Sequence, residues 1–66
     1  MKTITIIQNA INELRLNGKA SIEVPGIDGI DIIEIPFGDF EIVFDDGDIV
    51  LDNLNEVAEW LWDYLS

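Results

Sequence analysis

The residues of this chain that could do chemistry are almost all carboxylates, because its 66 residues include 14 Asp and Glu but no Cys and no His. Without those two residue types there is no thiol nucleophile, no thiolate metal site and no imidazole base. Paired carboxylates can act as acid and base when burial separates their pKa values, and Asp45, Asp46 and Asp48 are close enough in the sequence for that. Such chemistry also needs a substrate cleft, which so short a chain hardly encloses. We therefore expect a protein that is not an enzyme and binds no cofactor.

The same aspartates could hold a hard cation through their oxygen atoms, as in the calcium-binding loop of EF-hands. With Gly47 in the glycine position of that loop the first ligand would be Ile42, and with Gly29 it would be Val24. Neither side chain carries an oxygen atom, so we expect no dedicated metal site. Weak binding of Ca²⁺ or Mg²⁺ stays open as an alternative. The segment Asp45-Asp46-Gly47-Asp48 predicts a tight hairpin turn, because Asp-Gly tolerates the positive φ that such a turn needs.

The charge of the chain is large, segregated and negative. Its formal value is −11 at pH 7, with all three bases and a single acid in residues 1–19 and the other thirteen acids in residues 20–66. Direct binding to nucleic acid or to an anionic membrane is disfavoured electrostatically, so a basic protein is the expected partner. The longest uncharged stretch, Thr3 to Asn12, is interrupted by polar residues. We expect a soluble, cytoplasmic protein.

The acids are interleaved with Ile, Phe and Trp, which favours acids on folded elements over an acidic disordered tail. On one face of a sheet, side chains recur about every 6.8 Å along a strand and about 4.8 Å between strands, which approaches the spacing of phosphates in a nucleic acid. The acids that could form such an array on the expected strands and the last helix are Glu23, Asp31, Glu41, Asp48, Glu56, Glu59 and Asp63. The alternative is a solvated surface that only keeps the protein soluble.

One aromatic residue, Trp60, stands among the acids of the expected last helix. At 100° per residue, Glu56, Glu59 and Asp63 share one helix face and Trp60 lies beside them. An aromatic ring there can stack on an Arg of a partner while the carboxylates pair with its guanidinium. The alternative is that Trp60 packs against the sheet or against Tyr64. We predict that the partner-binding residues are Glu56, Glu59, Trp60 and Asp63, followed by Glu41, Asp45, Asp46 and Asp48.

The elements that must position these residues begin with an amphipathic helix. Its apolar residues recur at helical spacing, and they are Ile4, Ile7, Ile11 and Leu14. Thr3 or a capping box of Thr5 and Gln8 is expected to begin this helix, and Asn17-Gly18 to end it. The β-branched run from Thr3 to Ile7 leaves a strand followed by a shorter helix as the alternative.

After this helix the apolar residues alternate with polar ones, which predicts strands at 20–24, 29–37, 40–44 and 49–51. Pro25-Gly26 is expected to end the first strand. Within the second, the consecutive Ile32 and Ile33 interrupt the alternation and indicate either a bulge or burial on both faces. Whether the sheet has three strands or four stays open, because the last strand is short.

Asn53, with Glu56 three residues later, predicts a capped start of the last helix. Its buried stripe is expected to be Leu54, Val57, Ala58, Leu61 and Leu65. The order of helix, antiparallel meander of three or four strands, and helix indicates a single α+β domain over residues 1–66, with both helices covering one sheet face. In that arrangement the acids of the sheet and those of the helix would lie on opposite sides of the molecule.

In size, acidity, element order and lack of catalytic residues, the chain resembles small phage-encoded inhibitors of host defence, including anti-CRISPR and anti-restriction proteins that imitate nucleic acid. The resemblance implies a protein that blocks the basic, nucleic-acid-binding surface of a partner. No residue motif carries it, so no functional residue is transferred from that class. The rival hypothesis is a small structural or interaction domain that homodimerises or docks through Trp60, Trp62 and Tyr64.

Overall fold

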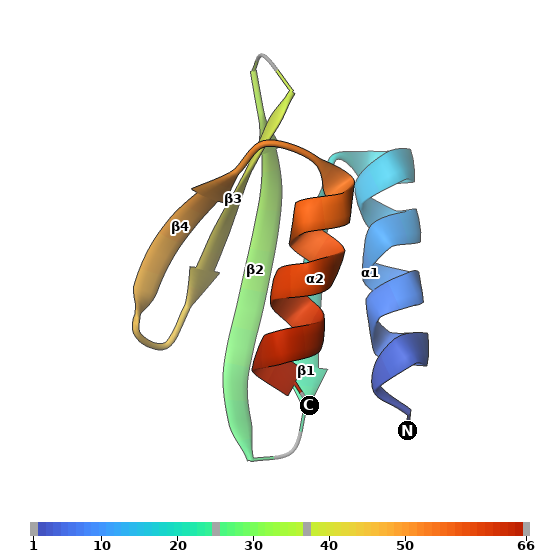
Figure 1. Cartoon of the computed structure of the whole chain (residues 1–66), viewed down its shortest axis with the longest axis vertical. Coiled ribbons are helices and arrows are strands. Elements are labelled where there is room, and N and C mark those ends of the chain that lie inside the picture. Colours follow the sequence, from blue (N-terminus) through green and yellow to red (C-terminus); the bar gives the residue numbers. More distant parts are fainter. Residues whose placement is uncertain (1, 25, 37, 66) are drawn as a thin grey trace.

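The computed structural model describes residues 2–24, 26–36 and 38–65 and shows a helix, a four-stranded sheet and a second helix (Figure 1). The elements are α1 (Thr3–Asn17), β1 (Lys19–Val24), β2 (Ile27–Ile35), β3 (Asp39–Phe44), β4 (Gly47–Leu51) and α2 (Leu54–Leu65). The α+β class and the element order are therefore confirmed. Two positions used in the predicted strand boundaries, Pro25 and Phe37, lie outside the described residues.

Helix α1 runs unbroken through the β-branched segment near the N-terminus, so the alternative of a strand there is wrong. The predicted side-chain caps are wrong as well. The helix follows Lys2 without a side-chain cap, and the carbonyl oxygen of Lys2 accepts from the N–H groups of Thr5 and Ile6 at 3.1 and 3.2 Å. At the other end Gly18 adopts φ 75° and its N–H donates to the carbonyl oxygen of Leu14 at 2.9 Å, which confirms the predicted glycine stop.

The four strands form an antiparallel meander in the order β1-β2-β3-β4, so β1 and β4 are the edges of the sheet. The predicted fourth strand is present. The predicted hairpin with β3 is present, but its two turn residues are Asp45 and Asp46 and not the Asp46-Gly47 pair, because Gly47 is already the first residue of β4 and pairs with Phe44. Gly47 has φ 140°, a conformation that favours glycine because it has no Cβ.

The consecutive isoleucines in β2 do not mark a bulge or burial on both faces, so that interpretation is wrong. Ile32 is fully buried, whereas Ile33 is 45% exposed on the other side of the sheet. The pairing with β1 is regular here, and the irregularity lies instead between Ile22 and Val24. The ordinary alternation of a strand therefore continues through both residues, and Ile33 is an apolar residue that faces solvent.

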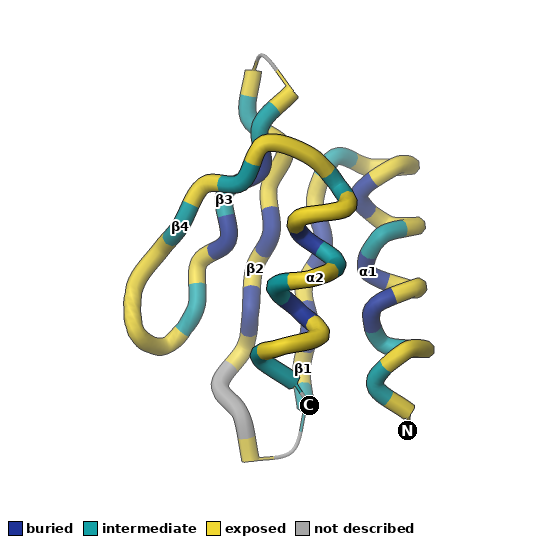
Figure 2. Tube along the Cα trace, in the orientation of Figure 1, coloured by how far each residue is buried: buried dark blue, intermediate teal, exposed yellow. Residues whose placement is uncertain are grey.

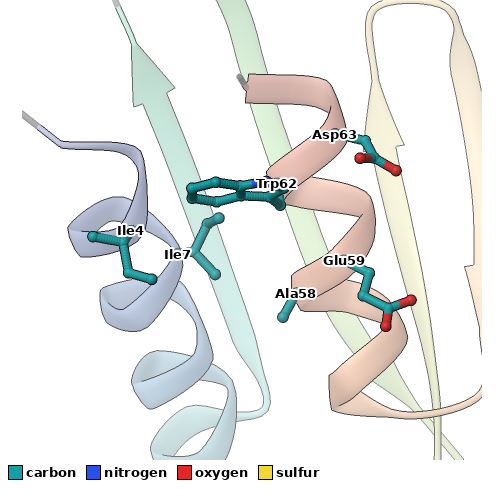
Figure 3. Close-up of a pocket in the computed structure, with 6 residues that line it drawn as sticks. All are labelled: Ile4, Ile7, Ala58, Glu59, Trp62 and Asp63. Atoms are coloured by element: carbon teal, nitrogen blue, oxygen red, sulfur yellow. The ribbon is translucent and has the colours of Figure 1, made fainter.

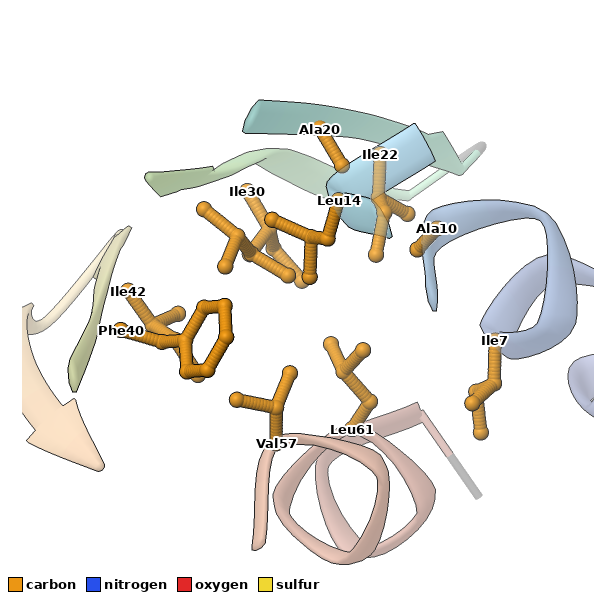
Figure 4. Close-up of a cluster of buried hydrophobic side chains, with 11 residues drawn as sticks. Ile7, Ala10, Leu14, Ala20, Ile22, Ile30, Phe40, Ile42, Val57 and Leu61 are labelled. Carbon is orange, nitrogen blue, oxygen red and sulfur yellow. The ribbon is translucent and has the colours of Figure 1, made fainter. Parts of the chain in front are cut away.

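Both helices pack on the same face of the sheet, as expected (Figures 1 and 2). α1 lies mainly over β1, and α2 lies beside α1. The core between the layers contains the following residues: Ile7, Ala10, Leu14, Ala20, Ile22, Ile30, Ile32, Phe40, Ile42, Val57 and Leu61 (Figure 4). Burying one apolar face of every element against a single core leaves the other sheet face open, and we call it the open sheet face.

Among the described residues, no helix combines the length and the apolar character that crossing a bilayer requires.

Candidate functional site

The eight residues predicted to bind a partner fall into two groups that the fold separates. Four lie on α2, namely Glu56, Glu59, Trp60 and Asp63, and four lie on the β3–β4 hairpin, namely Glu41, Asp45, Asp46 and Asp48. Because α2 covers one face of the sheet and Glu41 and Asp48 lie on the other, the two groups do not form one continuous array. The single lattice of carboxylates considered from the sequence is therefore replaced by two acidic surfaces.

Glu56 helps to begin α2. Its backbone N–H donates to Oδ1 of Asn53 at 2.9 Å, and its carboxylate Oε2 accepts from the backbone N–H of Asp52 at 3.1 Å. These two bonds confirm the predicted cap, except that the reciprocal bond goes to Asp52 and not to the N–H of Asn53. The negative charge of Glu56 also lies in the first turn of the helix, where the macrodipole favours it. This carboxylate consequently has a structural task of its own.

Glu59 and Asp63 lie one turn apart on the outer side of α2, and both are exposed. Like charges at this spacing repel each other by about 0.2–0.5 kcal/mol, so nothing in the helix itself favours the pair. We call these two residues the acidic ridge.

Trp60 packs within the molecule. Its ring stacks on that of Tyr64, with centroids 4.8 Å apart and planes 11° apart, and it meets the ring of Phe44 edge to face at 4.9 Å. Phe44 also meets Tyr64 edge to face at 5.5 Å. Trp60 is half-buried as a result, and of the two roles considered for it the structure shows the packing role. This aromatic cluster fastens α2 to the end of β3.

On the open sheet face, acids alternate with apolar residues in both directions. One cross-strand row runs Asp31, Val43, Asp48, and the next runs Ile33, Glu41, Val50. Asp31 is held by the Ser21 hydroxyl, which donates to its Oδ1 at 2.8 Å. Asp45 and Asp46 lie at the turn that ends this surface, and both are exposed. The face thus mixes carboxylates with apolar side chains, and β1 adds Ser21 and Lys19 to the two rows.

On the helix side, α1 and α2 leave a groove between them that was not predicted. It has a volume of about 390 Å³ and is lined by Ile4, Ile7, Ala58, Glu59, Trp62 and Asp63. Figure 3 shows the Trp62 ring extending from α2 toward Ile4 and Ile7 of α1, with the two carboxylates on the outer side of α2. We call this hollow the interhelical groove, and the acidic ridge forms its border on α2.

Two exposed residues of the groove, Ile4 and Trp62, had different places in the sequence prediction. Ile4 was assigned to the buried stripe of α1, which is wrong because it is 50% exposed, and Trp62, which is 48% exposed, was named only as a docking residue of the rival hypothesis. Ala10 takes a place in the core instead. On a helical wheel Trp62 and Trp60 lie on opposite sides of the acidic face, and the wheel alone does not show which of the two rings packs against the end of β3.

Within residues 2–24, 26–36 and 38–65, no three Asp or Glu side chains come together in a way that could hold a metal ion. No protein family, no curated protein and no solved structure matches this chain. Its own surfaces are therefore the basis for a functional proposal.

Proposed function

We propose that this chain is a protein-binding module that acts without catalysis, by occupying a basic, nucleic-acid-binding surface of a partner protein and blocking it. The observation that carries the proposal is the acidic ridge of Glu59 and Asp63 beside the exposed Trp62. Surfaces that bind nucleic acid combine Lys and Arg with groups on which bases stack. Carboxylates next to an exposed indole complement such a surface in charge and in shape.

The size of the charge supports the same proposal. Solubility requires an excess of only a few charges in a domain of this size. The chain has a net charge of −11, and the repulsion among these charges destabilises the folded state. Glu59 and Asp63 add to that repulsion, and neither forms a hydrogen bond to another described side chain that would explain its position on α2. A selected function in binding a basic surface accounts for them. It also implies fast, electrostatically steered association that weakens as salt is added.

A second candidate function, an interaction domain that homodimerises or docks through C-terminal aromatic residues, is favoured by the exposure of Trp62 alone. Trp60 and Tyr64 already stack on each other and on Phe44. A dimer would also bring two chains of charge −11 together. Salt separates the two candidates, because a charge-driven complex weakens with ionic strength while an apolar dimer holds or tightens.

The test is capture from a nuclease-treated bacterial lysate at about 50 mM salt, with elution by salt and identification of the bound proteins. Two double variants that each remove two charges serve as matched baits: Glu59→Gln with Asp63→Asn on α2, and Glu41→Gln with Asp48→Asn on the sheet. We expect one basic protein that the wild-type chain retains, that its own nucleic acid displaces, that the α2 variant loses and that the sheet variant keeps. Retention that nucleic acid does not compete, or retention of this chain alone, would contradict the proposal.

A further inference from the structure

The interhelical groove has the form of a site for a helix. It continues along α1 into a second hollow of about 460 Å³, which shares Ile4, Ile7 and Ala58 with the first and extends to Ile11, Asn12 and Arg15. From residue 4 to residue 15 an α-helix rises about 16 Å, which equals about three helical turns. A third helix of some three turns could therefore lie along the two that form the groove.

The groove is apolar at its floor and at its open end. Ile7 is buried and Ala58 is half-buried, while Ile4 and Trp62 are each about half exposed on opposite helices, at 50% and 48%. Figure 3 shows these two side chains on either side of the hollow. Apolar side chains of an occupant would remove both residues from water, and this burial is favourable in proportion to the area covered.

The charges around the groove determine the chemistry of the occupant. Glu59 and Asp63 border it on α2, and Arg15 lies at its far end on α1. A second copy of this chain, or any acidic segment, would meet repulsion along α2. A helix with Lys or Arg beside its apolar stripe would form ion pairs with both carboxylates. Its basic residues would have to lie at the end of the groove away from Arg15, where like charges would repel each other.

We propose that the interhelical groove docks an amphipathic basic helix of the partner protein, with apolar side chains against Ile4 and Trp62 and Lys or Arg side chains against Glu59 and Asp63. The proposal rests on the proposed function and deepens it by naming the element of the partner that is recognised. It assigns the main contact to the helix side of the molecule and not to the open sheet face. Trp62, and not Trp60, becomes the aromatic residue that contacts the partner.

The test uses a synthetic 14-residue peptide with a Leu stripe flanked by Arg, and a second peptide of the same composition whose order destroys the stripe. Each is titrated into isotopically labelled chain at about 150 mM salt, where long-range attraction between exposed charges is largely screened. Ile4→Ser removes a groove side chain, and Val50→Ser removes a side chain of similar exposure, 50% against 53%, from the open sheet face. Circular dichroism of both variants verifies that they fold.

We expect the striped peptide to shift the Trp62 indole and Ile4 methyl resonances, and we expect Ile4→Ser to weaken its binding about fivefold. Val50→Ser should leave the affinity unchanged, and the unstriped peptide should bind more weakly. Equal binding of both peptides, no binding, or a loss on Val50→Ser without one on Ile4→Ser would overturn the groove as the docking site. Capture of a partner that nucleic acid displaces would still support the proposed function in those cases, so the two proposals fail separately.

Discussion

Two substitutions of the same kind on one helix should change the stability of this protein in opposite directions. Glu56→Gln and Glu59→Gln each replace a carboxylate of α2 with an amide of the same shape, and each changes the net charge by one. Glu56 lies in the first turn and accepts a hydrogen bond from the N–H of Asp52. Glu59 lies one turn before Asp63, and the like charges of the two carboxylates repel each other. The structure therefore assigns a stabilising charge to Glu56 and a destabilising one to Glu59.

The magnitudes follow from these contacts. Removing the charge of Glu56 loses about 0.3–1 kcal/mol of interaction with the helix dipole and weakens a charge-assisted hydrogen bond, while relief of repulsion from Glu59 returns a few tenths of a kcal/mol. We expect a net loss of about 0.5–1 kcal/mol for Glu56→Gln. Removing the charge of Glu59 relieves repulsion from both Glu56 and Asp63, so we expect a gain of about 0.5 kcal/mol.

The assay is thermal and urea unfolding followed by circular dichroism at low salt. For a domain of this size, the expected free-energy changes lower the Tm by about 2–8 °C for Glu56→Gln and raise it by about 2–4 °C for Glu59→Gln. Added salt should reduce the difference in Tm between the two variants, because both effects are electrostatic. Equal shifts for the two variants would refute the reasoning, since they would show that only the net charge matters and that the position on α2 does not.

Three further predictions, which use five substitutions, concern the glycines, the turn and the aromatic cluster. Gly47→Ala should destabilise the fold by about 1–3 kcal/mol, because Gly47 has a φ of 140°. Gly29→Ala is the control: its new Cβ would lie 3.9 Å from the carbonyl oxygen of Ile22, so the free energy of unfolding should change by less than about 0.5 kcal/mol. Chemical denaturation measures both changes. Asp46→Asn should change stability by less than about 0.5 kcal/mol in the same assay, because Asn and Asp are both well tolerated at turn positions and the residue is exposed. Trp60→Ala should cost about 2 kcal/mol through loss of the aromatic cluster, and Trp62→Ala markedly less; a larger loss for Trp62→Ala would contradict the assignment of the two rings.

Signals confined to a few neighbouring residues predicted the fold well. Gly18 ends α1, the hairpin turns at Asp45 and Asp46, and Asn53 with Glu56 begins α2. The cap of α1 was mispredicted because the N–H groups of Thr5 and Ile6 donate to the carbonyl oxygen of Lys2, and no side chain caps the helix. The consecutive isoleucines of β2 were mispredicted because hydrophobicity alone does not distinguish an apolar residue in the core from one that faces solvent.

The candidate site could be predicted only in part. The helical wheel correctly placed Glu59 and Asp63 on the outer side of α2, because the buried stripe of the helix faces the core. It could not rank Trp60 against Trp62, since both lie at the edges of that outer face. Which of them packs depends on where the end of β3 lies, and the ring of Phe44 there is far away in the sequence.

The amino-acid sequence by itself determined the order of the elements, the end of α1, the start of α2, the β3–β4 hairpin and the segregation of charge, because these depend on interactions within a few residues and on composition. The tertiary structure decided that the acids of the sheet and those of α2 lie on opposite sides of the molecule, that Trp60 packs against Phe44, and that Ile4 and Trp62 border a shared groove. Each of those outcomes depends on how elements distant in the sequence pack against each other. Burying every apolar stripe in one core fixes that packing, and the surfaces left outside are its consequence.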